Sequence, residues 1–199
     1  MHSAPRLETE RLTLRGFTAA DLDAHAAMLA DDEVMRFIGG TGLSREEAWR
    51  KLAAGVGLWV LQGHGLWAVE RTADGVLIGH VGLFDFHREM TPSIEGEPEM
   101  GWVFVRDAHG QGYAREACEA ALAWADAELG VAIPAIIALE NGASIRLAER
   151  LGFVRVGDAE YKGELFALFR RGARGLRGNW EEPGVAAKPR RRSGHEGSL

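Results

Sequence analysis

The length, composition and charge of the chain indicate a globular protein and exclude several other classes. The sequence has 199 residues, of which 46% are hydrophobic and 26% charged, the ordinary mix of one folded domain. A single cysteine, Cys118, excludes an internal disulfide framework, and no apolar run approaches the roughly 18 residues of a membrane span. Because the polar start also lacks a signal-peptide pattern, we expect a cytoplasmic protein with no membrane partner.

The formal net charge of −6 is unevenly distributed along the chain. Residues 183–199 combine a cluster of Lys and Arg with Pro, Gly and Ser, and we predict a disordered basic tail there. The remainder, residues 1–182, is acidic and is predicted to form a single domain. An acidic fold is a poor general binder of nucleic acid and a reasonable host for a cationic substrate. Both a monomer and a homodimer are compatible with the sequence.

The first part of the chain is predicted to contain one strand and two helices. Residues 11–17 alternate apolar and polar side chains, which is typical of a strand. Residues 18–30 and 44–56 each begin with a capping box, a hydroxyl residue followed three positions later by an acid, and we predict a helix over each range. The glycine-rich stretch 55–65 is expected to end the second helix.

Strands and a loop are predicted to follow. Residues 66–71 and 76–86 are strand-like runs on either side of Asp74-Gly75, a strong hairpin signal. Residues 88–98 contain two prolines and several acids, and we expect them to form an exposed loop. Residues 100–105 are predicted to form the next strand.

The remaining elements complete a mixed α/β pattern without an internal repeat. Residues 112–129 are rich in alanine and favour a long helix, and the apolar run 133–139 favours a strand buried on both faces. Residues 144–151 are predicted to form a helix, followed by strands over 153–156 and 164–170. This order favours a largely antiparallel sheet flanked by helices.

The most informative segment is the glycine loop between the strand 100–105 and the helix that follows it. Gly110 and Gly112 precede the first turn of that helix, where unpaired backbone N–H groups favour a phosphate. A P-loop would need Gly-Lys-Ser/Thr, yet Gly112 is followed by Tyr113 and Ala114. A dinucleotide fingerprint would need a third glycine where Arg115 stands. The loop therefore indicates a phosphate ligand of another kind.

Further motifs, taken together with this loop, resemble the GNAT superfamily of N-acyltransferases, in particular its RimJ/RimL branch. The matching pieces are Leu7–Arg15 (LETERLTLR), Glu99–Trp102 (EMGW), Gly110–Ala117 (GQGYAREA), the pair Asn141 and Ser144, and Leu151–Phe153 (LGF). The resemblance covers residues 7–171. It implies an α+β fold with a central sheet of six to seven strands and about four helices, in which the strands 100–105 and 133–139 splay apart.

The resemblance also implies how acetyl-CoA binds. The backbone of Val103, Phe104 and Val105 is expected to pair with the pantetheine arm as an added strand does. The pyrophosphate is expected to bind the loop and first helical turn, formed by His109, Gly110, Gln111, Gly112, Tyr113, Ala114 and Arg115. Asn141 is expected to hydrogen-bond the pantetheine or to lie near the thioester. No metal is predicted, because the histidines show no metal-ligand spacing.

Three catalytic residues are expected, Glu99, Ser144 and Asn141. Many family members carry a tyrosine seven residues after the asparagine as the acid that protonates the leaving thiolate, but here that residue is Ala148. Ser144 or a bound water is therefore expected to supply this proton. Glu99 is the preferred general base. Glu97, His80 and Asp85 are the alternatives.

The predicted function is transfer of the acetyl group of acetyl-CoA to a primary amine by direct attack in a ternary complex. A protein N-terminal α-amine is the favoured acceptor, and a small-molecule amine such as an amino acid, polyamine or antibiotic is the alternative. A non-catalytic acyl-CoA-binding module and a nucleotide-binding protein are further alternatives. Acceptor contacts are expected from the segments 31–41, 55–67 and 88–98, which are predicted to be loops.

Overall fold

The computed structural model describes residues 3–173, and the predicted basic tail at 183–199 lies outside them. The strands are β1 (Leu7–Glu8), β2 (Leu12–Arg15), β3 (Leu66–Arg71), β4 (Val76–Phe84), β5 (Met90–Thr91), β6 (Glu99–Phe104), β7 (Ile133–Ala138), β8 (Val154–Tyr161) and β9 (Glu164–Arg171). The α-helices are α1 (Leu22–Leu29), α2 (Asp32–Met35), α3 (Arg45–Gln62), α4 (Tyr113–Glu128) and α5 (Gly142–Arg150). None of the helices in this part of the chain combines the length and the hydropathy needed to cross a membrane.

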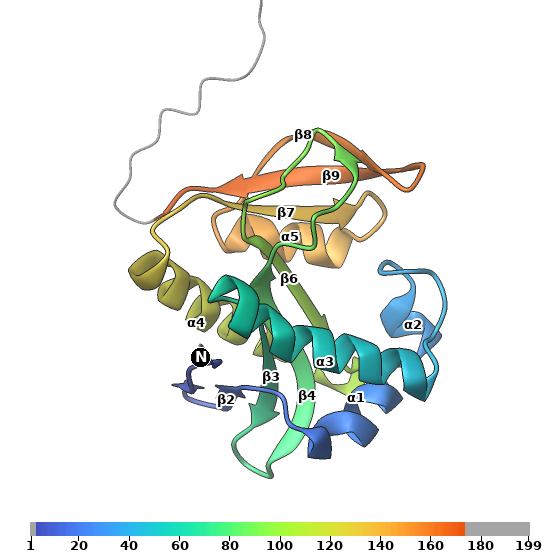
Figure 1. The fold of residues 1–199 in the computed structure, drawn as a ribbon, viewed down its shortest axis with the longest axis vertical. Helices are drawn as coiled ribbons and strands as arrows, with labels where there is room; N and C mark the ends of the chain where they lie inside the picture. The colour runs from blue at the N-terminus through green and yellow to red at the C-terminus, as the bar shows by residue number, and fades with distance from the viewer. Residues whose placement is uncertain (1–2, 174–199) are drawn as a thin grey trace, which may run out of the picture.

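The strands form two antiparallel sheets that meet between β6 and β7 (Figure 1). The first sheet has the order β1-β2-β3-β4-β6 and the second the order β5-β8-β9-β7. β6 and β7 contact each other but share no hydrogen-bonded ladder. The α+β fold predicted from the sequence is confirmed, with the sheet divided between the two strands that were expected to splay.

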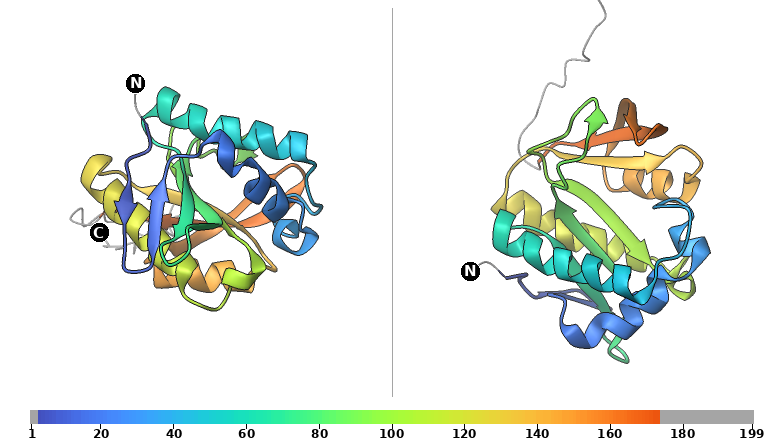
Figure 2. Two further views of the ribbon diagram at one scale, coloured as in Figure 1. Left: turned by 90° about the horizontal axis from the view of Figure 1, so that it is seen from below. Right: turned by 45° about the vertical axis from the view of Figure 1, so that its right-hand side comes forward.

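Helices cover both faces of the first sheet (Figure 2). α1 and α3 lie on one face and α4 lies on the other, while α5 lies beside β7 of the second sheet. The largest core cluster joins α4 and α5 to both sheets and includes Cys118, Ala148 and Phe153. Cys118 is completely buried, as expected for a small apolar side chain without a reactive role.

The helix α3 is longer than predicted, because Gly55 and Gly57 do not end it. It continues to Gln62 and ends at Gly63, which has a left-handed φ of 76°. Gly55 is buried, and a Cβ atom there would lie 3.2 Å from Leu66 Cδ1. The glycine thus lets the helix approach β3 closely, and the packing offsets its poor helix propensity of about 1 kcal/mol.

The segment 55–67 was predicted to be a loop but contains the end of α3 and the start of β3, and the other two predicted loops also contain regular structure. Residues 88–98 were expected to be an exposed loop, but Met90–Thr91 pairs with β8, and Met90 and Ile94 are buried with Ala159 and Leu168. The apolar side chains thus anchor this segment despite its prolines. Residues 31–41 include the short helix α2, whose first N–H groups are capped by the Asp31 side chain.

Candidate active site

The outer edge of β6 carries backbone groups that face the gap between the sheets. The Val105 amide donates to Ile78 O at 2.9 Å, inside the first sheet. Because hydrogen-bonding direction alternates along an antiparallel strand, the backbone groups of Val103 also face β4. In this register the backbone groups of Val103 and Val105 are engaged within the first sheet, and their pairing with pantetheine stays a prediction. The groups of Trp102 and Phe104 face outward instead.

The glycine loop after β6 exposes amides at the start of α4. Gly110 and Gly112 have φ angles of 72° and 83°, a left-handed conformation that glycine adopts without strain. Gly112 is the N-cap of α4, and no side chain caps this helix. The first N–H groups of the helix therefore lack a side-chain cap and suit an anion.

The polar side chains of the loop are engaged with the protein itself. His109 Nε2 lies 3.0 Å from the carbonyl oxygen of Phe104, and the Gln111 side-chain amide donates to the carbonyl of Asp107. Arg115 pairs with Glu119 one turn along α4. These contacts fix the loop and leave its backbone amides, including those of Tyr113 and Ala114, as the groups suited to a ligand.

Trp102, Asn141 and Ser144 meet at the point where the two sheets separate. Asn141 is the N-cap of α5, and its Oδ1 accepts from Ser144 N at 3.1 Å. Trp102 Nε1 donates to Ser144 Oγ at 3.3 Å. Because an indole N–H can only donate, Ser144 Oγ acts as acceptor and keeps its own proton. No acceptor for that proton is found within residues 3–173, so the hydroxyl is free to donate to a ligand.

Ala148 lies at the position where many family members carry the acidic tyrosine, and its side chain is completely buried. It packs in the core cluster that joins α4 and α5 to both sheets. Ser144 is therefore the one side chain of α5, residues 142–150, that carries a hydroxyl.

Glu99 lies at the start of β6 and is ion-paired with Arg88. The Glu99 carboxylate is 4% exposed and accepts from Arg88 Nε at 2.6 Å and Nη2 at 3.2 Å. The guanidinium also lies over the rings of Phe86 and Tyr161. Burial raises the pKa of the Glu99 carboxyl above its ordinary value, and Arg88 opposes that shift.

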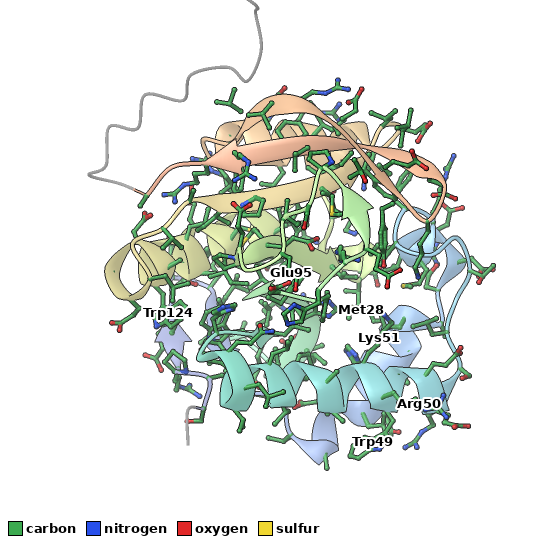
Figure 3. All side chains as sticks on the ribbon, turned by 45° about the horizontal axis from the view of Figure 1, so that its top comes forward. Met28, Trp49, Arg50, Lys51, Glu95 and Trp124 are labelled. Carbon is green, nitrogen blue, oxygen red and sulfur yellow. The ribbon has the colours of Figure 1, made fainter. Side chains whose placement is uncertain are left out.

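The alternative bases also have partners or are shielded. Glu97 is ion-paired with Arg170, and Asp85 accepts from the backbone N–H groups of His87 and Gly96, both at 2.7 Å. His80 lies on β4 opposite Val103, where burial lowers its pKa to about 3. The loop that carries Glu95 crosses between α3 and the second sheet (Figure 3).

The fold and these motifs define an acetyltransferase. The family model for the acetyltransferase (GNAT) domain matches residues 11–154, well over half of the chain. The chain therefore belongs to the GNAT acetyltransferases, of the RimJ/RimL type. Members of this family take the acetyl group from acetyl-CoA and transfer it to nitrogen.

Individual proteins support the same assignment. The uncharacterized N-acetyltransferase YoaA of Bacillus subtilis is 30% identical over 158 residues, which cover 77% of this chain and 85% of that protein. A GNAT-family acetyltransferase structure from Bordetella pertussis superposes with a TM-score of 0.75 at 31% identity, covering 84% of this chain and 99% of the other. RimL, an α-N-acetyltransferase of ribosomal protein L7/L12 solved with coenzyme A, has a TM-score of 0.69 at 14% identity, covering 84% and 98%. The last likeness concerns the fold alone.

Sequence reasoning missed three residues of this region: Arg11, Arg88 and Trp102. Arg88 and Arg11 act through ion pairs with residues distant in sequence, which no local pattern reveals. The alternation of Trp102 with Val103 along one strand was visible in the sequence. Which of the two turns its backbone N–H and C=O groups toward the gap depends on how β6 pairs with β4.

Proposed function

We propose that this protein transfers the acetyl group of acetyl-CoA to the α-amine of a protein N-terminus, by direct attack in a ternary complex. The observation that carries the proposal is the separation of β6 from β7 next to the uncapped start of α4. One end of this gap offers the outward-facing backbone groups of Trp102 and the outward-facing amide of Phe104 for the pantetheine arm, since the Phe104 carbonyl already contacts His109. The other end offers amides from Gly110 to Ala114 for the pyrophosphate.

The kind of amine follows from the protonation cost. Attack on a thioester requires a neutral amine, and an α-amine with a pKa near 8 pays about 1.4 kcal/mol at pH 7. A lysine side chain pays roughly 4.6 kcal/mol and needs a strong, accessible base. Glu99, the preferred base, has both oxygens engaged by Arg88. This arrangement favours the α-amine, from which a water can carry the proton to Glu99.

In this mechanism the amine nitrogen attacks the thioester carbon, the carbon–sulfur bond breaks, and the sulfur leaves with the bonding electron pair. The amine proton passes through water to Glu99. Ser144 donates its hydroxyl proton to the sulfur and regains a proton from water, to which Glu99 returns the proton taken from the amine. Trp102 keeps the Ser144 oxygen oriented as an acceptor of the indole N–H. Asn141 fixes the start of α5, so that Ser144 stays beside the gap.

The class of acceptor is tested by thiol release from acetyl-CoA with three sets of amines. The first set is peptides with a free N-terminus, the second is peptides with an acetylated N-terminus and an unmodified lysine side chain, and the third is small polyamines or amino acids. The proposal predicts turnover with free N-terminal peptides and little with the lysine peptides. Turnover restricted to small amines would overturn the protein acceptor. Binding of acetyl-CoA without turnover would instead indicate a non-catalytic acyl-CoA-binding module.

Replacing Ser144 with alanine should lower kcat on the order of 100-fold, because general acid catalysis typically contributes at least that much. The dissociation constant for acetyl-CoA should stay unchanged. Ser144→Thr keeps the hydroxyl and serves as the matched control, with most of the activity retained. An unchanged kcat in Ser144→Ala would mean that water, and not Ser144, supplies the proton.

Glu99→Gln tests the base separately. A carboxylate that accepts the amine proton must be ionised, so the wild-type kcat/KM should fall as the pH drops through the pKa of Glu99. The variant should lose both this limb of the pH profile and most of its turnover. If the profile and the turnover both survive the substitution, Glu99 has a structural role only.

A further inference from the structure

The first turn of α4 is held by a segment from the other end of the chain. Glu116 Oε1 accepts from Thr9 Oγ1 at 2.6 Å and from Arg11 N at 2.9 Å. Glu116 Oε2 accepts from Arg11 Nε at 2.7 Å. Thr9 and Arg11 lie in the turn between β1 and β2, and the Glu116 side chain is 18% exposed. Both carboxylate oxygens are therefore satisfied in a largely buried setting.

Arg11 also contacts the glycine loop directly. Its Nη1 donates to the carbonyl oxygen of Gln111 at 3.0 Å, and its guanidinium lies 4.5 Å from the centroid of the Tyr113 ring. Arg11 therefore touches the residues on both sides of Gly112, the N-cap of α4. One side chain links the β1–β2 turn, the loop and the helix.

The contact with Gln111 has a consequence for the neighbouring amide. The carbonyl of Gln111 and the N–H of Gly112 belong to one planar trans peptide, in which the two groups point in opposite directions. When Arg11 holds the oxygen, the Gly112 N–H is directed away from Arg11. Glycine can change φ easily, and Gly110 and Gly112 lie on either side of Gln111. Without the contact from Arg11, the Gly112 N–H would therefore be free to point elsewhere.

The charge of Glu116 matters as well. A free carboxylate in the first turn of α4 would repel a phosphate bound at the same helix end. Here burial acts to raise the pKa of Glu116, but the hydrogen bonds from Thr9 and Arg11 outweigh it and keep the pKa low. The carboxylate is thus ionised, and the Arg11 guanidinium neutralises it on the side facing β2.

We propose that Thr9, Arg11 and Glu116, termed the N-terminal clamp, are positioning residues for the pyrophosphate of acetyl-CoA. The clamp touches no reacting atom; it directs the Gly112 amide and neutralises the acid beside it. This gives a physical role to the Leu7–Arg15 motif, far from the loop in sequence. The inference rests on the proposed binding of acetyl-CoA.

The test compares two acyl donors that differ in the phosphates. Acetyl-CoA carries the pyrophosphate, whereas S-acetylpantetheine lacks it, and calorimetric titration gives the dissociation constant of each without requiring turnover. The variants are Glu116→Gln and Arg11→Lys, which keeps the charge but loses the fork that reaches both Glu116 and Gln111. Glu119→Gln makes the same charge change one turn away, where the acid pairs with Arg115 and not with Arg11, and is the matched control.

The clamp predicts that Glu116→Gln weakens acetyl-CoA binding about 10- to 100-fold, since a charged hydrogen bond is lost, and that Arg11→Lys also weakens it. S-Acetylpantetheine binding should be unchanged in both variants, and Glu119→Gln should resemble wild type. An equal loss for both donors, or no loss for either, would overturn the clamp while leaving the proposed function intact. A wild-type protein that does not bind acetyl-CoA would overturn both.

Discussion

Replacing Arg88 with methionine should lower the free energy of unfolding by about 3–5 kcal/mol at pH 7, because it leaves the Glu99 carboxylate buried without its partner. Glu99 is 4% exposed, and Arg88 engages both its oxygens. Methionine fills much of the same volume, so that the loss comes from the charge rather than from a cavity. The midpoint and slope of urea unfolding measure it.

Two further variants separate the buried charge from other causes. The double variant Arg88→Met/Glu99→Leu removes both charges and should recover most of the stability. Arg155→Met breaks the exposed pair with Asp158, whose side chains are 51% and 48% exposed, and should cost less than about 1 kcal/mol. If Arg88→Met cost no more than Arg155→Met, the Glu99 carboxylate would not depend on Arg88, and the electrostatic description of this region would be wrong.

We also expect the protein to lose stability in mild acid, because of His25 and His80. Their ring centroids lie 5.5 Å apart, and Phe17 packs edge-on against both. Both ring nitrogens of His25, and Nδ1 of His80, lack a hydrogen-bond partner within residues 3–173. Lys51 and Trp49 project from opposite sides of α3 (Figure 3).

This environment disfavours the protonated rings. Burial, with the charge of Lys51, lowers the pKa of His25 to about 4, although Asp21 opposes the shift. Burial, with His25 and Lys51, lowers the pKa of His80 to about 3. In the unfolded chain each pKa is about 6.5. As the pH falls below 6.5, the unfolded state binds protons that the folded state does not, so stability decreases.

Each histidine should therefore cost about 2 kcal/mol at pH 5 relative to pH 8, or roughly 4 kcal/mol together. Urea unfolding at pH 8, 7, 6 and 5 gives the dependence directly. His25→Leu should remove about half of the loss, and the double variant with His80→Leu nearly all of it. A variant with the full wild-type pH dependence would assign the acid lability to other groups.

Local sequence patterns predicted the parts of this molecule that depend on local chemistry. The loop with Gly110 and Gly112 was located because a strand, a glycine turn and a helix start follow one another in the chain. The capping residues Thr18 and Ser44 were identified for the same reason, and both capping boxes are present. The pair of strands that separate was inferred from the family resemblance, and the two-sheet topology confirms it.

Features that depend on distant partners could not be predicted. The outward direction of the Trp102 backbone depends on the register of β6 against β4. The continuation of α3 through Gly55 depends on close packing against Leu66. The contacts of Glu99 and Glu116 with arginines require the folded chain. In each case a tertiary contact, rather than local propensity, determines the outcome.

Calorimetric titration of the wild-type protein with acetyl-CoA, ATP and NAD shows whether the glycine loop and the gap beside it hold acetyl-CoA. Gly112→Ala and Gly152→Ala provide a matched pair, because both glycines have left-handed φ angles, 83° and 88°, but only the first lies in the loop. We expect saturable binding of acetyl-CoA in preference to ATP and NAD, weakened by Gly112→Ala and not by Gly152→Ala. Absence of acetyl-CoA binding, or preference for ATP or NAD, would contradict it.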